Sequence, residues 1–328
     1  MSVNGRGLDP ERAQLTGAGS GQAEARPEKY PTYRQIPGEH EDDPTYYDLP
    51  LLKQPVWEAS VPLYFYFGGV AGAAGTLAAV GQLWGAPCSL VKKLRWLNLI
   101  GTGVGSALLI EDLGRPERFL NMLRVFRPSS PMSVGSWVLA FNGITTGGAV
   151  LLDRGPAWMR WLAAVSGLKA GLFAALQCAY PGVLVACTTV PIWQQSRRSL
   201  PPLFVASCMA SLGSLAPWLG LLDPALERFG TAGKVAELVA MRAVQIESSR
   251  VERVGRPWNQ GRSGRMWRWA GSMTAASLVL GLLPGKSLWK KRLAGLLGTA
   301  GAVTMRLAVL EAGKASSQDP RASFHSQR

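Results

Sequence analysis

ASVPLYFYFGGVAGAAGTLAAVGQLWGAPCSLV, residues 59–91, is a run of 33 residues without a single charged side chain. A helix needs about 20 predominantly apolar residues to cross the hydrocarbon core of a bilayer. Three further charge-free runs, residues 128–152, 170–196 and 199–222, contain 25, 27 and 24 residues. A soluble protein has little use for four such runs. The sequence therefore indicates an integral membrane protein of the all-α class, because helices satisfy their backbone hydrogen bonds within the membrane.

We expect about eight transmembrane helices. Of these, the fourth is long and contains Pro181 and Pro191, which predict a kink or a break. The sixth carries several charges, among them Glu237 and Arg242, and can span only if these groups face protein or water. If it lay on the membrane surface, the number of spans would be one lower. The predicted ranges are 61–84, 94–112, 133–152, 161–192, 201–222, 228–247, 267–284 and 289–312.

Charge is distributed unevenly along the chain. Residues 1–58 hold 6 Lys and Arg against 10 Asp and Glu, whereas residues 59–328 hold 29 against 11. The basic residues lie in short clusters between apolar runs, which favours lipid headgroup contact over nucleic-acid binding. We expect a polar extended tail over residues 1–56, a transmembrane domain over 57–313 and a polar tail over 314–328. The numbers of Lys and Arg in alternate loops are too similar to decide the orientation.

Redox ligands are scarce in this sequence. Its two histidines, His40 and His325, both fall in the expected tails. A b-type haem needs axial ligands inside the helices, and these are usually histidines. The four cysteines contain no C-x-x-C pair and supply no iron–sulfur ligand set. We therefore expect no haem, iron–sulfur cluster or other metal on this chain. A redox role would depend on a diffusible molecule such as a quinone, with the metal centres on another chain.

Four polar residues in or beside the predicted helices could have a chemical role. Asp112 ends the second predicted helix and is followed by Arg115. The pair could be a local ion pair at a helix end, or it could exchange protons with a quinone headgroup. Tyr64 could belong to an interfacial aromatic belt. Tyr180 lies deeper, beside Pro181, and its phenol could hydrogen-bond either a ligand carbonyl or a backbone carbonyl.

Further charges fall inside the predicted spans, including Glu237, Arg242 and Arg306. Charged groups at membrane depth are costly, so they are paired with one another or line a wet path. A proton path through these three residues is one interpretation. A set of structural ion pairs between helices explains them equally well.

Three segments of the chain have the form of a known membrane-protein signature. The longest is IEDLGRPERFLNMLRVFRPSSPMSVGSW, residues 110–137. The second is YPGVLVACTTVPIW, residues 180–193, which is followed by Arg197, Arg198 and LPPLFVAS. The third is RLAVLEAGKASSQDPR, residues 306–321. Together these segments resemble the NrfD/polysulfide reductase family of integral membrane subunits.

This resemblance implies an NrfD-like bundle of transmembrane helices that holds no metal and exchanges electrons with menaquinone or ubiquinone. It implies two partners in the membrane complex: an iron–sulfur subunit of ferredoxin type, and a catalytic subunit that is molybdopterin-dependent or multihaem. By position in the motifs, the quinone contacts fall on Trp57, Tyr64, Asp112 and Tyr180, and Asp112 and Arg115 would be catalytic. The expected location is the bacterial inner membrane, which the chain would cross several times.

The sequence thus favours a quinone-binding membrane subunit of an oxidoreductase complex. A proton-translocating or purely anchoring subunit of such a complex is the main alternative. A stand-alone transporter is a weaker one, because the two halves of the sequence lack a matching pair of broken helices.

Overall fold

A computed structural model gives the structure of the protein and describes residues 52–55, 57, 59–113, 116–285, 287–320 and 322. These residues belong to a compact unit that spans Leu51–Arg328. Most of the predicted N-terminal tail lies outside the described residues, as do His40 and His325. The described part is helical, which confirms the predicted all-α class.

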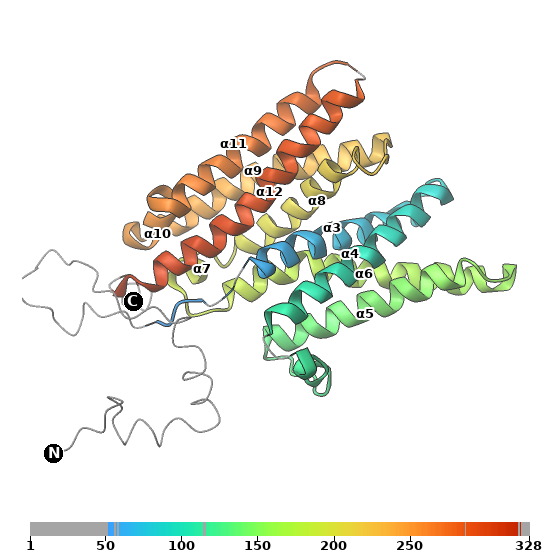
Figure 1. Ribbon diagram of the computed structural model, residues 1–328, viewed down its shortest axis with the longest axis horizontal. Helices are drawn as coiled ribbons and strands as arrows, with labels where there is room; N and C mark the ends of the chain where they lie inside the picture. The colour runs from blue at the N-terminus through green and yellow to red at the C-terminus, as the bar shows by residue number, and fades with distance from the viewer. Residues whose placement is uncertain are drawn as a thin grey trace, which may run out of the picture. The chain divides into compact units, whose positions relative to one another are not determined.

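Eight long helices make up most of the described structure (Figure 1). They are α3 (Ser60–Leu83), α4 (Cys88–Asp112), α5 (Pro131–Leu152), α6 (Arg160–Ala186), α8 (Leu200–Leu215), α9 (Pro224–Ser248), α11 (Gly261–Leu282) and α12 (Leu288–Ser317). Four short elements connect them: η4 (Pro116–Leu123), η5 (Ala157–Met159), α7 (Pro191–Gln195) and α10 (Glu252–Asn259).

Each of the eight predicted helices is present, although some bounds differ. The fourth was predicted to reach residue 192, but α6 ends at Ala186 and a separate helix, α7, begins at Pro191. Proline suits the first turn of a helix because the N–H that it lacks would have no partner there. Pro181, in contrast, lies inside α6 without ending it. Helix α8 ends at Leu215, short of the predicted 222, and α12 continues past the predicted 312 to Ser317.

Helix α4 begins at Cys88, before the predicted residue 94, and therefore includes Lys92 and Lys93, which are exposed. Arg95 follows on the same helix, and its side chain is buried. Its guanidinium contacts Asp153 at 2.7 Å, at the end of α5, and donates a hydrogen bond to Gln82 at 2.5 Å. A paired arginine can lie in the packed interior, so charge does not stop the helix here.

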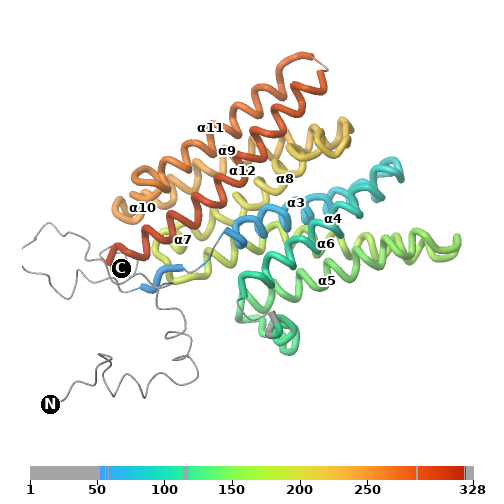
Figure 2. Tube along the Cα trace, viewed as in Figure 1, coloured from blue at the N-terminus to red at the C-terminus, as the bar shows by residue number. Residues whose placement is uncertain are grey.

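The helices form two groups of four that pack on each other. Helices α3, α4, α5 and α6 form the first group, and α8, α9, α11 and α12 form the second. The groups meet where α8 packs against α3 and α6, and where α12 packs against α3, as Figure 2 traces along the chain. Consecutive long helices alternate in direction. The end at which α3 begins, called here the α3-start end, also carries α7, α10 and the last turns of α4, α6, α9 and α12.

Four helical segments are long and apolar enough to cross a membrane by length and composition alone: Ser60–Leu83, Pro131–Leu152, Ala157–Ala186 and Leu288–Ser317. Helix α8 is apolar but shorter. Helix α9 is the charged sixth helix of the sequence prediction, and it buries Lys234 and Glu237 against the protein. That burial is the condition under which we expected this helix to span the membrane. The fold is that of a multi-pass membrane protein.

Small residues let the helices of the first group approach closely. A Cβ added to Gly72 of α3 would lie 2.7 Å from the backbone oxygen of Ala174 and 2.7 Å from the sulfur of Cys178, both on α6. A larger side chain would therefore push α3 and α6 apart. Glycine at helix crossings is typical of membrane bundles, where packing rather than the hydrophobic effect holds helices together.

Candidate functional site

Asp112 is the last residue of α4 and lies at the α3-start end. The hydroxyl of Ser60, the first residue of α3, donates a hydrogen bond to Asp112 Oδ1 at 3.1 Å. The carboxylate is partly buried, so it is held between two helix ends and still has access to its surroundings. Arg115, the expected partner of Asp112, lies outside the described residues, so its role stays a prediction.

Tyr64 lies one turn beyond Ser60 on α3, so the two side chains share a face. Its side chain is only 3% exposed. The ring packs against α4, where a Cβ added to Gly105 would lie 3.2 Å from it. Within the described residues, the Tyr64 hydroxyl has no hydrogen-bond partner. It is therefore a buried donor that remains available to a ligand.

Tyr180 extends from α6 toward α5. Its ring occupies the space over Gly135, so closely that a Cβ at that position would overlap the ring. The phenol is near enough to Tyr64 for the two groups to interact electrostatically. Like Tyr64, its hydroxyl has no hydrogen-bond partner in the described part of the chain. Among these residues, no backbone carbonyl accepts a hydrogen bond from Tyr180.

Trp57 lies at the same end but faces another neighbour. Its ring stacks on Trp193 of α7, with the ring centroids 5.7 Å apart and 17° between the planes. Trp193 is completely buried, and its indole N–H donates a hydrogen bond to the carbonyl of Val309 at 2.9 Å. Trp57 therefore fastens the segment before α3 to α7 and α12. Asp112, Tyr64 and Tyr180 thus lie toward the same end of the bundle, and Trp57 contacts α7 at that end.

The three grouped residues offer a specific chemistry. A carboxyl group can take up and release a proton, and each phenol can donate a hydrogen bond to a carbonyl oxygen. Aromatic and glycine-lined surfaces between the helices provide an apolar setting. Such donors suit a flat ligand that carries carbonyl oxygens.

A second set of polar residues is buried between α8, α9 and α12. Arg306 of α12 is completely buried. Its Nη1 donates hydrogen bonds to Ser207 Oγ at 2.9 Å and to the carbonyl of Ala302 at 2.8 Å. Its guanidinium carbon lies 5.5 Å from the ring centroid of Tyr66, a distance at which a cation is attracted to a π-system. The remaining nitrogens, Nε and Nη2, have no hydrogen-bond partner.

Glu237 of α9 is also completely buried, and both of its carboxyl oxygens lack a hydrogen-bond partner. The Ser207 hydroxyl that accepts from Arg306 faces Glu237 as well. In the described structure, Glu237 and Arg306 form no direct ion pair, and Ser207 lies between the carboxyl group and the guanidinium group. Buried polar atoms that have no partner in the protein commonly bind a water molecule. We call Glu237, Ser207 and Arg306 the buried charge cluster.

Arg242, the third residue of the predicted proton path, is not part of this cluster. It is exposed, and its guanidinium contacts Gln245 on the same helix at 3.4 Å. Lys234 is 8% exposed and lies one turn before Glu237, close enough to interact with it electrostatically. The structure thus joins two of the three predicted residues and adds Lys234 in place of Arg242.

A buried amide network crosses the first group of helices and was not expected from the sequence. Asn142 of α5 donates hydrogen bonds to Asn98 Oδ1 at 3.0 Å and to Gln177 Oε1 at 2.7 Å. Gln177 in turn donates to the carbonyl of Gly68 at 3.0 Å. Each amide group is satisfied, so the network fixes how α3, α4, α5 and α6 align.

The missed residues did carry a signal. Ser207, Ser211 and Ser214 recur with helical spacing in an otherwise apolar segment, and all three are completely buried. Likewise, Asn98 and Asn142 are carboxamides in the middle of helices that face lipid elsewhere. Polar residues at such positions predict contact between helices.

Comparison with protein families gives one match. The family described as polysulphide reductase, NrfD, matches residues 50–222, which is more than half of the chain. The match contains Asp112, Tyr64 and Tyr180, whereas Glu237 and Arg306 lie beyond it. No curated protein matches the chain.

Proposed function

This chain belongs to the polysulphide reductase, NrfD family, and on that premise we propose that it is the quinone-binding membrane subunit of an oxidoreductase complex. Its multi-pass helical fold agrees with a membrane subunit of such a complex. In this proposal, electrons are exchanged with an iron–sulfur partner of ferredoxin type. A catalytic subunit, molybdopterin-dependent or multihaem, completes the complex in a bacterial cell membrane. The quinone, menaquinone or ubiquinone, is the substrate of this chain.

One observation carries the proposal: a partly buried carboxylate and two phenols that have no hydrogen-bond partner among the described residues lie toward one end of the bundle. The reduction of a quinone to a quinol consumes two electrons and two protons. Asp112 would deliver or accept protons at the end of α4, where solvent is near. Tyr64 and Tyr180 would donate hydrogen bonds to the quinone oxygens and fix the headgroup in place. Positioned proton donors of this kind contribute about 100-fold or more to a reaction rate.

The substitution Asp112→Asn tests this role. It keeps an acceptor for Ser60 and removes the titratable group, so we expect quinol turnover by the purified complex to fall about 100-fold. Oxidation or reduction of a soluble dye by the partner subunits should continue, because that reaction bypasses the quinone. Glu111→Gln is the matched control, since Glu111 is the adjacent carboxylate and is exposed. Undiminished quinol turnover in Asp112→Asn would refute the assignment.

The buried charge cluster supports a second candidate function, proton translocation by the same subunit. Glu237 and Arg306 lie deep between helices with unpartnered polar atoms, and Ser207 lies between them. A purely structural ion pair would be expected to join the two charges directly. Separated charges that bind water can instead pass a proton along a chain of hydrogen bonds.

Proteoliposomes that contain the complex separate this function from quinone chemistry. We expect Glu237→Gln to retain quinone turnover while the number of protons translocated per quinone falls toward zero. Glu252→Gln is the control, because Glu252 is exposed on α10. Proton translocation unchanged by Glu237→Gln, or absent from the wild type, would leave the chain as a quinone-binding or anchoring subunit only.

A further inference from the structure

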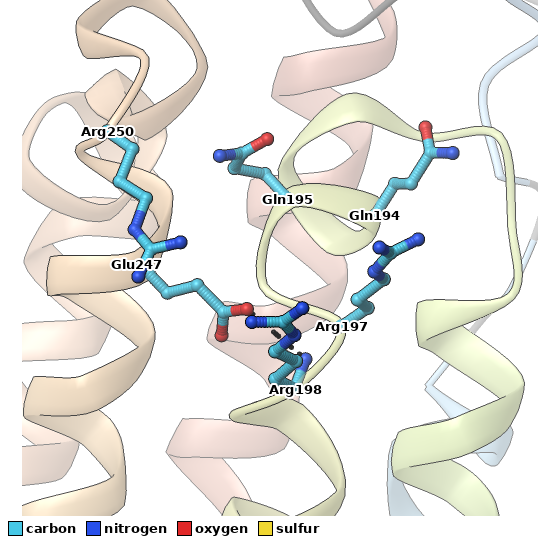
Figure 3. A pocket seen from close by; sticks show the side chains of 6 residues that line it. All are labelled: Gln194, Gln195, Arg197, Arg198, Glu247 and Arg250. Atoms are coloured by element: carbon cyan, nitrogen blue, oxygen red, sulfur yellow. Dashed lines mark hydrogen bonds between the residues drawn. The ribbon is translucent and has the colours of Figure 1, made fainter.

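A basic pocket lies at the α3-start end, between the α7–α8 connection and the end of α9. It has a volume of about 240 Å³. Figure 3 shows Arg250, from the turn after α9, on the side of the pocket opposite the connection that carries Arg197 and Arg198. The six residues that line it are Gln194, Gln195, Arg197, Arg198, Glu247 and Arg250.

The carboxylate in the pocket belongs to Glu247, and it already accepts hydrogen bonds from other groups of the protein. Glu247 accepts hydrogen bonds from Ser199 Oγ at 2.5 Å, from Ser199 N at 3.0 Å and from Arg198 N at 3.4 Å. These groups lie at the N-terminus of α8, and a carboxylate at a helix N-terminus is stabilised by the helix dipole. Glu247 therefore caps α8 and forms no ion pair with the three arginines of the pocket.

The three guanidinium groups consequently have no partner among the described residues. Arg197, Arg198 and Arg250 carry three positive charges around one hollow, beside two carboxamides that can donate hydrogen bonds. Guanidinium groups bind phosphate oxygens in a bidentate manner, which makes such a cluster suited to a phosphate ester. The pocket is therefore built for an anion.

The surface next to the pocket indicates the source of that anion. Helix α9 exposes Val235, Val239 and Ile246, with 46%, 65% and 56% of their side chains accessible. Their spacing places them on one side of α9, which also exposes Arg242, and Arg250 follows in the turn after the helix, four residues beyond Ile246. An exposed apolar stripe on a membrane helix contacts acyl chains. The stripe thus ends at the basic pocket, as the chains of a phospholipid end at its headgroup.

We propose that this pocket binds the phosphodiester of an anionic phospholipid whose acyl chains lie along the apolar stripe of α9. Arg197, Arg198 and Arg250 contact the phosphate oxygens, and Gln194 and Gln195 donate to the rest of the headgroup. Basic pockets between membrane helices are known to select anionic headgroups over zwitterionic ones. The site is separate from Asp112 and does not depend on the proposed quinone chemistry.

Native mass spectrometry of the full-length chain, titrated with phosphatidylglycerol in detergent, tests this inference. The triple variant Arg197→Gln, Arg198→Gln, Arg250→Gln should bind phosphatidylglycerol about 100-fold more weakly, since each arginine contributes about fivefold. Lys93→Gln, Arg160→Gln, Arg228→Gln is the matched control. It removes the same charge from exposed positions at the opposite helix ends, and it should bind like the wild type. Phosphatidylcholine should bind weakly to all three proteins.

Each other outcome contradicts the proposal. Equal losses in the two triple variants would show general electrostatics rather than a site. Inorganic phosphate that competes with phosphatidylglycerol at equal concentration would show an anion site without lipid selectivity. Unchanged lipid binding together with loss of the co-purifying partner subunits would identify the pocket as a protein interface. Circular dichroism of the arginine variant must retain the helical signal of the wild type, and a folded variant with unchanged affinity overturns the inference.

Discussion

At the scale of single residues, the chemistry of the α3-start end depends on where two phenols are held. Tyr64 is fixed by α4, whereas Tyr180 is fixed by the absence of a side chain at Gly135. The Tyr180 ring is the far end of a flexible side chain, so it can move if that space is filled. The helices themselves would not have to separate. A substitution at position 135 should therefore displace the Tyr180 hydroxyl while leaving the tyrosine itself in place.

We predict that Gly135→Ala raises the KM for quinol about fivefold, equivalent to the loss of one hydrogen bond of about 1 kcal/mol. Tyr180→Phe should give a similar increase, because it removes the same donor. Gly143→Ala, on the same helix, is the control, since a Cβ there would lie at an ordinary 3.8 Å from Thr102. Steady-state quinol oxidation by the complex measures the effect. An unchanged KM in both test variants would remove Tyr180 from the site.

Individual residues also show what the sequence could reveal about the site. Asp112 and Tyr180 stood out, because a carboxylate at a helix end and a tyrosine beside a proline are unusual in apolar runs. The position of Ser207 between Glu237 and Arg306 could not be predicted, because the three residues lie on helices that are distant in sequence. Arg242, which was predicted to lie on the same path, is exposed, and composition does not reveal which face of α9 is buried. The absence of a metal or haem stays a prediction.

At the scale of helices, the structure is governed by crossings that only small residues permit. Gly72 lies where α3 crosses α6, and the atoms opposite it include a backbone oxygen that cannot be displaced by a side-chain rotation. Gly103 of α4 is an exposed glycine with no atom near its missing Cβ. These two positions share the intrinsic cost of a β-branched residue in a helix and differ in packing.

Gly72→Val should therefore destabilise the purified chain by about 1–3 kcal/mol, the usual range for an overpacked interior. Gly103→Val should leave its stability close to that of the wild type. The melting temperature in detergent, followed by circular dichroism, distinguishes them. Equal melting temperatures for the two variants would mean that α3 and α6 do not approach as closely as described here.

The sequence predicted the number of long helices correctly but placed several of their ends wrongly, and the helix boundaries show why. Charge-free runs marked the apolar centres of the helices well. They could not mark the start of α4, because Lys92 and Lys93 interrupt the apolar pattern although the helix continues through them. Nor could they separate α6 from α7, because the last part of α6 and all of α7 lie within one charge-free run. The pairing of Arg95 with Asp153, which lets α4 carry a buried charge, is a property of the tertiary structure.

At the scale of the whole molecule, the alternating directions of the long helices give each connection a definite side of the membrane. Cys88 begins α4 at the end opposite to α3-start, and Cys187 follows α6 at the α3-start end. Three helices, α4, α5 and α6, separate these two cysteines. Both thiols are exposed, whereas Cys178 and Cys208 are buried. The native cysteines therefore report on the topology without any substitution.

We predict that a membrane-impermeant maleimide added to intact spheroplasts labels either Cys88 or Cys187, and that inside-out vesicles give the opposite result. Cys178 and Cys208 should react only after denaturation. Mass spectrometry of the labelled peptides identifies the sites, and Cys88→Ser and Cys187→Ser variants confirm the assignment. Asp112 lies at the same end as Cys187, so the result also identifies the side on which the proposed quinone site opens. Labelling of both thiols from one side would mean that α4, α5 and α6 do not all cross the membrane, and the topology would have to be revised.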